Sequence, residues 1–171
     1  MKISITAAAL ALATAWLATP AAAQDHPMMR PSKGFDQLKA LVGEWDGQVV
    51  SGKTMHASYQ LVSGGTALLE RLTMGNEPEM VTLFTPDGDR LAVTHYCSAG
   101  NQPQMQTTAI TGPINEFSFS FVRATNLASA TAGHMHHLTV TVQDHDHMSE
   151  AWTWSDNGTE HVEVFRYTRK S

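Results

Sequence analysis

The segment FDQLKALVGEW, residues Phe35–Trp45, decides the fold because it marks the point at which a short helix gives way to strands. Its apolar residues recur at the three- and four-residue spacing of a helix that buries one face. We therefore predict a helix over Phe35–Val42 that plugs one end of the domain. The Gly43-x-Trp45 step that follows begins the first of many short strands.

Turn signals recur about every 10 residues from Glu44 onward, as they do in all-β domains. Between the turns, polar and apolar residues alternate, so that Phe117, Phe119 and Phe121 share one face of a strand. The predicted strands are 44–52, 54–62, 66–74, 79–85, 90–97, 104–110, 115–123, 134–143, 147–155 and 160–169. Antiparallel strands without helical crossovers must form two sheets or close on themselves. We predict a single up-and-down β-barrel, because closure leaves no exposed strand edge.

The first 23 residues have the features of a secretory signal peptide. Lys2 precedes the apolar, alanine-rich run Ile3–Leu17, and Ala21–Ala23 suits the cleavage site. The apolar run is too short to span a bilayer comfortably, and no other stretch suggests a membrane span. We expect cleavage near Ala23, a flexible leader over 24–34 and one barrel domain over 35–171, located in the periplasm or secreted.

Charge and motifs exclude several classes of function. The net charge is −5 with the histidines neutral, and no basic stripe is present, which argues against nucleic acid and anionic membranes as partners. The chain has no G-x-S-x-G, H-E-x-x-H or glycine-rich phosphate loop. We therefore expect no catalytic residues and a protein that is not an enzyme. Cys97 is the only cysteine, so no internal disulfide can form.

Three polar residues interrupt apolar strand faces and are candidates for a ligand site. His95 continues the face of Leu91 and Val93, and Glu70 and Glu150 lie within similarly apolar strands. Sites for small molecules combine a mostly apolar lining with a few placed polar groups, so we expect these three residues to fix the polar end of an apolar ligand. The aromatic and thioether side chains expected to line the cavity are Tyr59, Met105, Phe119 and Trp152.

Two alternatives remain for the same residues. In the first, His95 is a core histidine with an internal hydrogen-bond partner and the barrel is filled, which would suit a structural or interaction role. In the second, histidine and cysteine bind a metal. His95 and Cys97 are two residues apart on one strand, His134 and His136 repeat that spacing, and imidazole with thiolate suits zinc or copper. The apolar-ligand hypothesis requires no cofactor.

The helix that leads into Gly43-x-Trp45, the ten predicted strands and the late arginine of FRYTR (Phe165–Arg169) resemble the calycin superfamily of lipocalins and fatty-acid-binding proteins. The resemblance implies a small-molecule binder in which Arg169, or alternatively Arg166, lies across Trp45 and closes the barrel. More narrowly, four segments are similar to uncharacterised exported bacterial lipocalin-like proteins: Gly64–Leu68, Thr94–Cys97, Asn101–Pro103 and His134–His136.

The strand number departs from lipocalins proper, which have eight strands, and brings the chain nearer to fatty-acid-binding and nitrobindin-like barrels. Nitrobindin-like barrels hold haem through a histidine late in the chain. For this sequence that resemblance implies His161, with His95 as the other candidate, because one histidine in an apolar pocket suffices as a proximal ligand.

Overall fold

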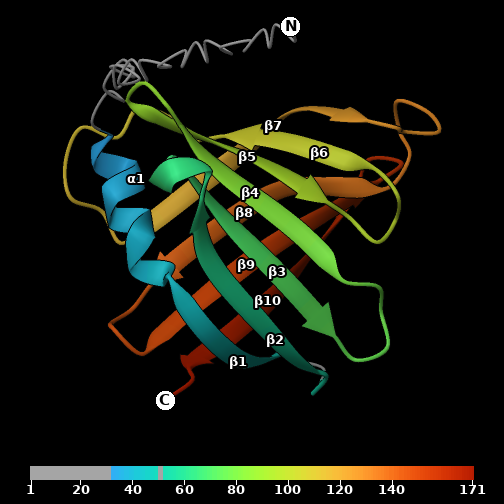
Figure 1. Ribbon diagram of the computed structural model, residues 1–171. Coiled ribbons are helices and arrows are strands. Elements are labelled where there is room, and N and C mark those ends of the chain that lie inside the picture. The colour runs from blue at the N-terminus through green and yellow to red at the C-terminus, as the bar shows by residue number, and fades with distance from the viewer. Residues whose placement is uncertain (1–31, 50–51) are drawn as a thin grey trace, which may run out of the picture.

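Antiparallel strands wind in chain order around a closed barrel, in which each strand pairs with the next and the last pairs with the first (Figure 1). The computed structural model describes residues 32–49 and 52–171. The ten strands are β1 (Gly43–Val49), β2 (Thr54–Val62), β3 (Ala67–Met74), β4 (Met80–Asp87), β5 (Arg90–Tyr96), β6 (Gln102–Gln106), β7 (Glu116–Thr125), β8 (His134–Val142), β9 (His147–Asp156) and β10 (Thr159–Arg169). The predicted up-and-down β-barrel is therefore confirmed.

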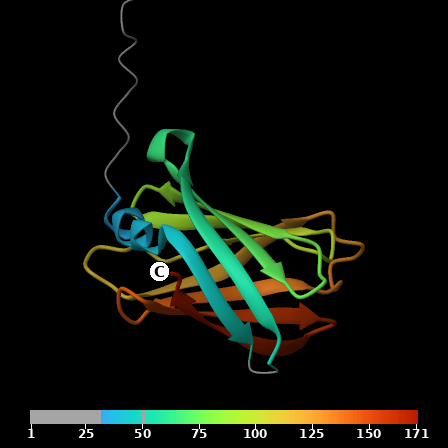
Figure 2. The same cartoon turned by 60° about the horizontal axis from the view of Figure 1, so that its bottom comes forward.

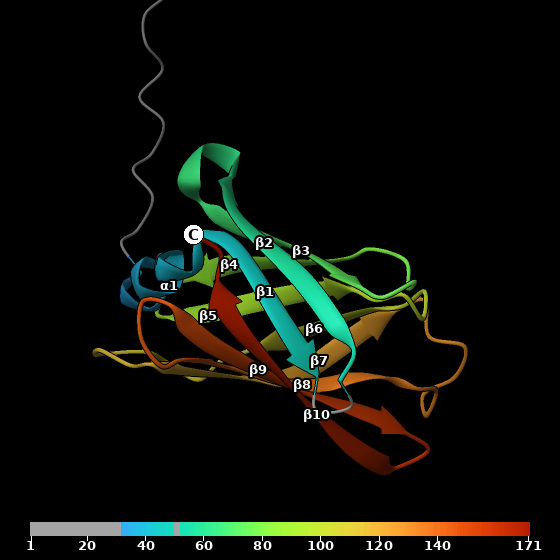
Figure 3. The ribbon, with the colours of Figure 1, turned by 90° about the horizontal axis from the view of Figure 1, so that it is seen from below.

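The predicted N-terminal helix is present at one end of the barrel, with different limits. The helix α1 (Lys33–Leu38) continues into a single 3₁₀ turn, η1 (Lys39–Leu41). It begins two residues before Phe35 because Ser32 caps it, with the Ser32 hydroxyl accepting a hydrogen bond from the Phe35 N–H at 3.3 Å. Val42 lies outside the helix and is exposed. Figure 3 shows α1 beside the end of the barrel at which β1 begins.

The expected leader over 24–34 and the predicted signal peptide fall largely outside the described residues. Residues Lys33 and Gly34 belong to α1 rather than to the leader. A Cβ atom at Gly34 would lie 2.7 Å from Cδ1 of Ile110, so a larger residue there would require the Ile110 side chain to shift. No helix within 32–49 and 52–171 has both the length and the apolar character needed to cross a membrane.

The strand limits agree with the predicted ones to within a few residues except at β6. The sequence predicted a strand over 104–110, whereas β6 covers Gln102–Gln106 and includes Pro103 in register with Ala124 of β7. After β6 the chain leaves the sheet, and Ile110 donates its N–H to the Asp89 carbonyl at 2.7 Å while its side chain packs on α1. A second 3₁₀ turn, η2 (Ser63–Gly65), joins β2 to β3 and projects from the barrel (Figure 2).

The core fills the helix end and the middle of the barrel. Phe35, Leu38, Leu41 and Trp45 are all buried where α1 meets the barrel. The middle is filled by inward-facing strand residues, among which the large, fully buried side chains are Leu68, Leu72, Phe84, Leu91, Met105, Phe117, Phe119 and Trp152. Burial of these side chains is the main favourable term in folding.

Candidate ligand-binding site

The helix end of the barrel is closed by an arginine. The Arg169 guanidinium lies over the Trp45 indole, with Cζ 4.1 Å from the ring centroid. Its Nη1 donates to the Val42 carbonyl and its Nη2 to the Ala40 carbonyl, both at 2.8 Å. These carbonyls follow the helix and would otherwise be unpaired. The contact that the family resemblance implied is therefore present with Arg169 and not with Arg166, which is exposed.

The other end of the barrel holds a cavity of about 430 Å³, here named the mouth pocket. Its strand residues come from the ends of β3, β5 and β9, the beginnings of β4 and β8, and the first half of β10 as far as Phe165, on the side of the barrel opposite α1. Residues outside the strands complete the lining: Lys53, Glu77, Cys97, Ser98 and Ala99. Three methionines (Met74, Met80 and Met135) and two tryptophans (Trp152 and Trp154) supply much of the wall. The volume lies within the range of about 300–1,000 Å³ that is usual for small-molecule sites.

His95 is the buried polar residue of the mouth pocket. Its side chain extends inward from β5, and the residue is 2% exposed. Nδ1 lies 2.9 Å from the Thr82 hydroxyl, and the imidazole packs on Trp152 with 4.6 Å between ring centroids. Nε2 is buried and has no hydrogen-bond partner among the described residues. Burial lowers the pKa of His95 to about 4, so the imidazole is neutral at pH 7.

The rim of the pocket is polar. Lys53 forms an ion pair with Glu77, and Glu163 adds a second carboxylate from β10. Cys97 also lines the pocket, and burial raises the pKa of its thiol, so the neutral thiol is favoured. The described residues of the rim therefore include two acidic side chains and one basic side chain.

One wall of the pocket depends on a close contact with the loop between β7 and β8. A Cβ atom on Gly133 would lie 2.3 Å from Cζ2 of Trp154, so only glycine allows this approach. Asn101 donates from Nδ2 to the Gly133 carbonyl at 2.9 Å, and Asn157 donates its N–H to the Thr131 carbonyl at 3.0 Å. The loop thus lies at the pocket end of the barrel and holds the indole of Trp154 in place.

Behind the pocket, two buried glutamates share a tyrosine. The Tyr59 hydroxyl lies 2.6 Å from Oε1 of Glu150 and 3.0 Å from Oε1 of Glu70. Oε2 of Glu150 accepts hydrogen bonds from Nε1 of Trp152 at 3.0 Å and from the Tyr167 hydroxyl at 3.5 Å. Burial and the neighbouring Glu150 hold the pKa of Glu70 well above its ordinary value, and burial also raises the pKa of Glu150.

The structure divides the residues predicted to bind ligand into two groups. His95 and Trp152 line the mouth pocket. The others are buried deeper in the barrel and do not line it: Tyr59, Glu70, Met105, Phe119 and Glu150. Sequence reasoning missed Met74, Met80 and Phe165. Met74 and Met80 lie at strand ends that meet opposite α1, and this position was the available signal, although reading it requires the strand order as well as the alternation.

The four predicted metal ligands lie in two separate pairs. His95 and Cys97 line the mouth pocket. His134 and His136 lie elsewhere, with Nε2 of the first 3.3 Å from Nδ1 of the second, and both rings pack on Phe121. In the described part of the chain, no three histidine, cysteine or acidic side chains converge as a metal site would require.

The haem ligand that the resemblance implied is not placed in the cavity. His161 is exposed near the start of β10 and is not among the residues that line the mouth pocket. His95, the other candidate, does line it and presents a neutral nitrogen.

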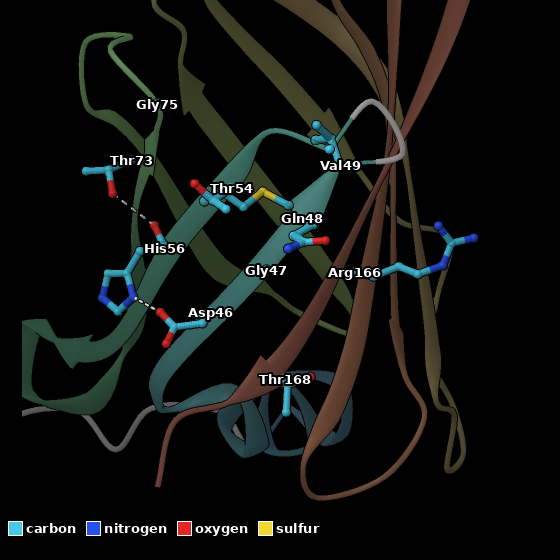
Figure 4. Close-up of a pocket in the computed structure, with 12 residues that line it drawn as sticks. Asp46, Gly47, Gln48, Val49, Thr54, His56, Thr73, Gly75, Arg166 and Thr168 are labelled. Carbon is cyan, nitrogen blue, oxygen red and sulfur yellow. Dashed lines mark hydrogen bonds and ion pairs between the residues drawn. The ribbon is translucent and has the colours of Figure 1, made fainter.

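A second hollow, of about 970 Å³, lies on the outer wall over β1, β2 and β10 (Figure 4). Its side chains include Asp46, Gln48 and Arg166, and Figure 4 shows the hydrogen bond between His56 and Asp46. None of the buried, unpartnered polar atoms of the described residues faces this groove. The mouth pocket is therefore the better candidate site, although the groove is larger.

Comparisons with known proteins support the fold. No family model and no curated protein matches the chain. A similar solved structure is that of a protein of unknown function from the DUF3598 family of Nostoc punctiforme PCC 73102, with 15% sequence identity and a TM-score of 0.52. The match covers 82% of this chain and 51% of the other, so this chain spans about half the length of that protein. Fold and site together define a closed antiparallel β-barrel with an interior pocket, an architecture compatible with calycin-like barrels.

Proposed function

We propose that the protein is exported and reversibly binds a small, mostly apolar molecule in the mouth pocket. The observation that carries the proposal is the buried Nε2 of His95, which has no hydrogen-bond partner in the described part of the chain and belongs to a residue lining an apolar cavity. A buried polar atom without a partner costs about 1–3 kcal/mol, and a bound ligand that completes its hydrogen bond would recover much of that cost. The signal-like features of residues 1–23 support export.

The lining explains why the ligand would be apolar. Leu72, Met74, Met80 and Phe165 present hydrocarbon and thioether groups to the cavity, and Trp152 adds a flat aromatic face. Transfer of apolar surface from water into such a cavity is favourable by roughly 25 cal/mol per Å². Thioethers are flexible and polarisable, so the pocket would tolerate ligands of somewhat different shape.

A second candidate function, the binding of haem or copper, is favoured by one specific observation. The imidazole of His95 is neutral and its Nε2 is free, which is the state in which histidine binds a metal. Cys97 and Met80 line the same cavity and carry the soft sulfur donors that copper(I) prefers. The axial or metal ligand would then be His95 rather than the exposed His161.

Native mass spectrometry of the protein from its own source, combined with an absorption spectrum, separates the two candidates. An added organic mass without a visible band supports the apolar ligand. A Soret band or a metal mass supports the second candidate and contradicts the first. A bare polypeptide that also shows no thermal shift with apolar probes supports the filled barrel and contradicts both.

A matched pair of substitutions locates the site. Met135→Trp places a large side chain on the pocket wall, and we expect it to abolish the added mass. Val122→Trp introduces the same side chain at a position of β7 that is 60% exposed and should leave the added mass unchanged. Loss of the ligand in both variants, or in neither, would contradict the mouth pocket as the site.

A further inference from the structure

We propose that the mouth pocket selects neutral apolar molecules that carry a hydroxyl or N–H hydrogen-bond donor, because His95 presents an unprotonated Nε2 to the cavity. This inference rests on the proposed function and deepens it by naming the class of ligand. It follows from the direction of proton donation along a row of buried polar groups that leads from the pocket into the barrel through Thr82, Glu70 and Tyr59.

The direction of proton donation is set first by the polar groups that lie deepest in the barrel. Tyr59 has one hydroxyl proton but lies within hydrogen-bond distance of both Glu150 and Glu70. Glu150 also faces the Trp152 N–H, which can only donate, and the Tyr167 hydroxyl, so donors surround this carboxyl group. A carboxylate is favoured where donors converge. Tyr59 therefore donates to Glu150, over the shorter distance of 2.6 Å.

The proton between Tyr59 and Glu70 must then belong to Glu70. Because the Tyr59 proton is directed to Glu150, the phenolic oxygen can only accept from Oε1 of Glu70, 3.0 Å away. Glu70 is fully buried and lies close to a second carboxyl group, and two such groups do not both ionise readily. Burial and the neighbouring Glu150 raise the pKa of Glu70, which favours its protonated form. Its Oε2 is then a carbonyl-like acceptor.

Thr82 connects this acceptor to the histidine. Thr82 of β4 is the cross-strand partner of Glu70, and the nearby Thr82 hydroxyl lowers the pKa of the Glu70 carboxyl group. Oε2 of Glu70 is buried and has no hydrogen-bond partner among the described residues, so the Thr82 hydroxyl beside this carboxyl group is the donor available to it. If the Thr82 proton is directed toward Glu70, the Thr82 oxygen accepts from Nδ1–H of His95, and Nε2 of His95 carries no proton.

The opposite direction of donation, from Thr82 to His95, is less favourable. If Thr82 donated to Nδ1 of His95, the histidine would carry its proton on Nε2. The Thr82 proton would then be directed away from the Glu70 carboxyl group, and Nε2–H would be a buried donor without a partner among the described residues. The favoured arrangement leaves a lone pair on Nε2 of His95, and this lone pair requires a donor from the ligand.

The charges around the pocket disfavour an anionic ligand. His95 is neutral, and Lys53, the one cation among the described lining residues, is paired with Glu77. Glu163, which has no ion-pair partner in residues 32–49 and 52–171, adds a negative charge at the rim. A carboxylate in the cavity would face a lone pair and no free cation of the described lining, and burial of an unpaired anion is strongly unfavourable. The candidate ligands that remain are neutral alcohols, phenols and N–H heterocycles of a size that fits the pocket.

Three probes of similar shape test the inference by isothermal titration at pH 7: 2-naphthol, 2-methoxynaphthalene and 2-naphthoate. We expect naphthol to bind about tenfold more tightly than its methyl ether, because only naphthol can donate to Nε2. Naphthoate should show no binding. In His95→Phe the preference for naphthol should disappear, whereas His161→Phe, the same change at an exposed histidine, should retain it.

The protonation of His95 can be measured directly in the wild-type protein, whether or not His95→Phe folds. Long-range ¹⁵N–¹H correlation spectra of the imidazole distinguish the two neutral forms, and we expect the proton on Nδ1. A proton on Nε2, equal affinities for naphthol and its ether, or tighter binding of naphthoate would each overturn the inference and leave the proposed pocket intact. Binding of none of the three probes, with no probe-induced thermal shift, would contradict the proposed function and the inference with it.

Discussion

The two ends of the barrel differ in how their polar groups are satisfied. At the helix end, the Arg169 guanidinium donates to three backbone carbonyls and packs on Trp45, so that its charge and its flat face are both used. At the mouth, Nδ1 of His95 contacts the Thr82 hydroxyl, but Nε2 is buried without a partner from residues 32–49 and 52–171. The first arrangement stabilises the fold. The second holds an unsatisfied group beside a cavity, which is what a binding site requires.

The largest expected effect is at the closed end. Trp45→Ala removes a fully buried indole and the surface on which Arg169 packs, and we expect the free energy of unfolding to fall by about 3–5 kcal/mol. Urea denaturation followed by circular dichroism measures the change. The matched variant at the mouth is Trp154→Ala, whose half-buried indole should cost clearly less. Equal losses of unfolding free energy in the two variants would contradict the claim that the helix end stabilises the fold more than the mouth does.

The next effect is the pH dependence contributed by His95. Its pKa falls from 6.5 to about 4 on folding, so the unfolded chain binds the proton more readily. Stability contributed by the neutral imidazole is therefore present above about pH 6.5 and is lost as the pH falls toward 4, by up to about 3 kcal/mol. The raised pKa of Glu70 acts in the opposite direction above pH 4.5.

Comparison with His95→Phe separates the pH dependence of stability that is due to His95 from the part that is due to the carboxyl groups. We expect the wild-type protein to lose stability relative to this variant as the pH is lowered from 6.5 to 4, as measured by urea denaturation at each pH. A constant difference between the two proteins over that range would contradict a buried, neutral His95.

The buried glutamates should respond unequally to the same substitution. Glu150→Gln places an amide among donors from Tyr59, Trp152 and Tyr167, and we expect a loss of about 2–3 kcal/mol. Glu70→Gln replaces a protonated carboxyl group by a neutral amide and should cost less than about 1 kcal/mol. Thermal unfolding at pH 7 compares the two variants, and a larger loss for Glu70→Gln would reverse the proton assignment.

The smallest expected effect is on the outer wall. Arg166→Ala removes an exposed side chain from the outer groove, and we expect the free energy of unfolding to change by no more than about 0.5 kcal/mol, with probe affinity unchanged. Urea denaturation and titration of 2-naphthol measure the two quantities. A weaker affinity for the probe would move the binding site from the mouth to the groove.

The alternation of the sequence was sufficient to predict the barrel. Phe117 and Phe119 face inward as predicted, and the turns fall where glycine, asparagine and proline mark them. The limits of β6 were missed because Pro103 indicates a break, although a proline can occupy a strand position at which its missing N–H is not needed.

The candidate site was predicted only in part because alternation gives the face of a residue but not its depth in the barrel. His95, Glu70 and Glu150 all face inward, yet only His95 reaches the mouth pocket. A bulge in β8 between Met135 and His137 shifts the register, and it is Met135 that lines the pocket. The alternation of side chains with a period of two predicts neither how deep a residue lies in the barrel nor where a strand contains a bulge.

The central claim is that a ligand binds at the mouth and not elsewhere in the barrel, and methionine methyl NMR tests it most directly. Met74, Met80 and Met135 line the mouth pocket, whereas Met148 is buried near the helix end. On titration with 2-naphthol we predict shifts for the first three methyl groups and none for Met148. Shifts confined to Met148, or equal shifts for all four, would contradict the account.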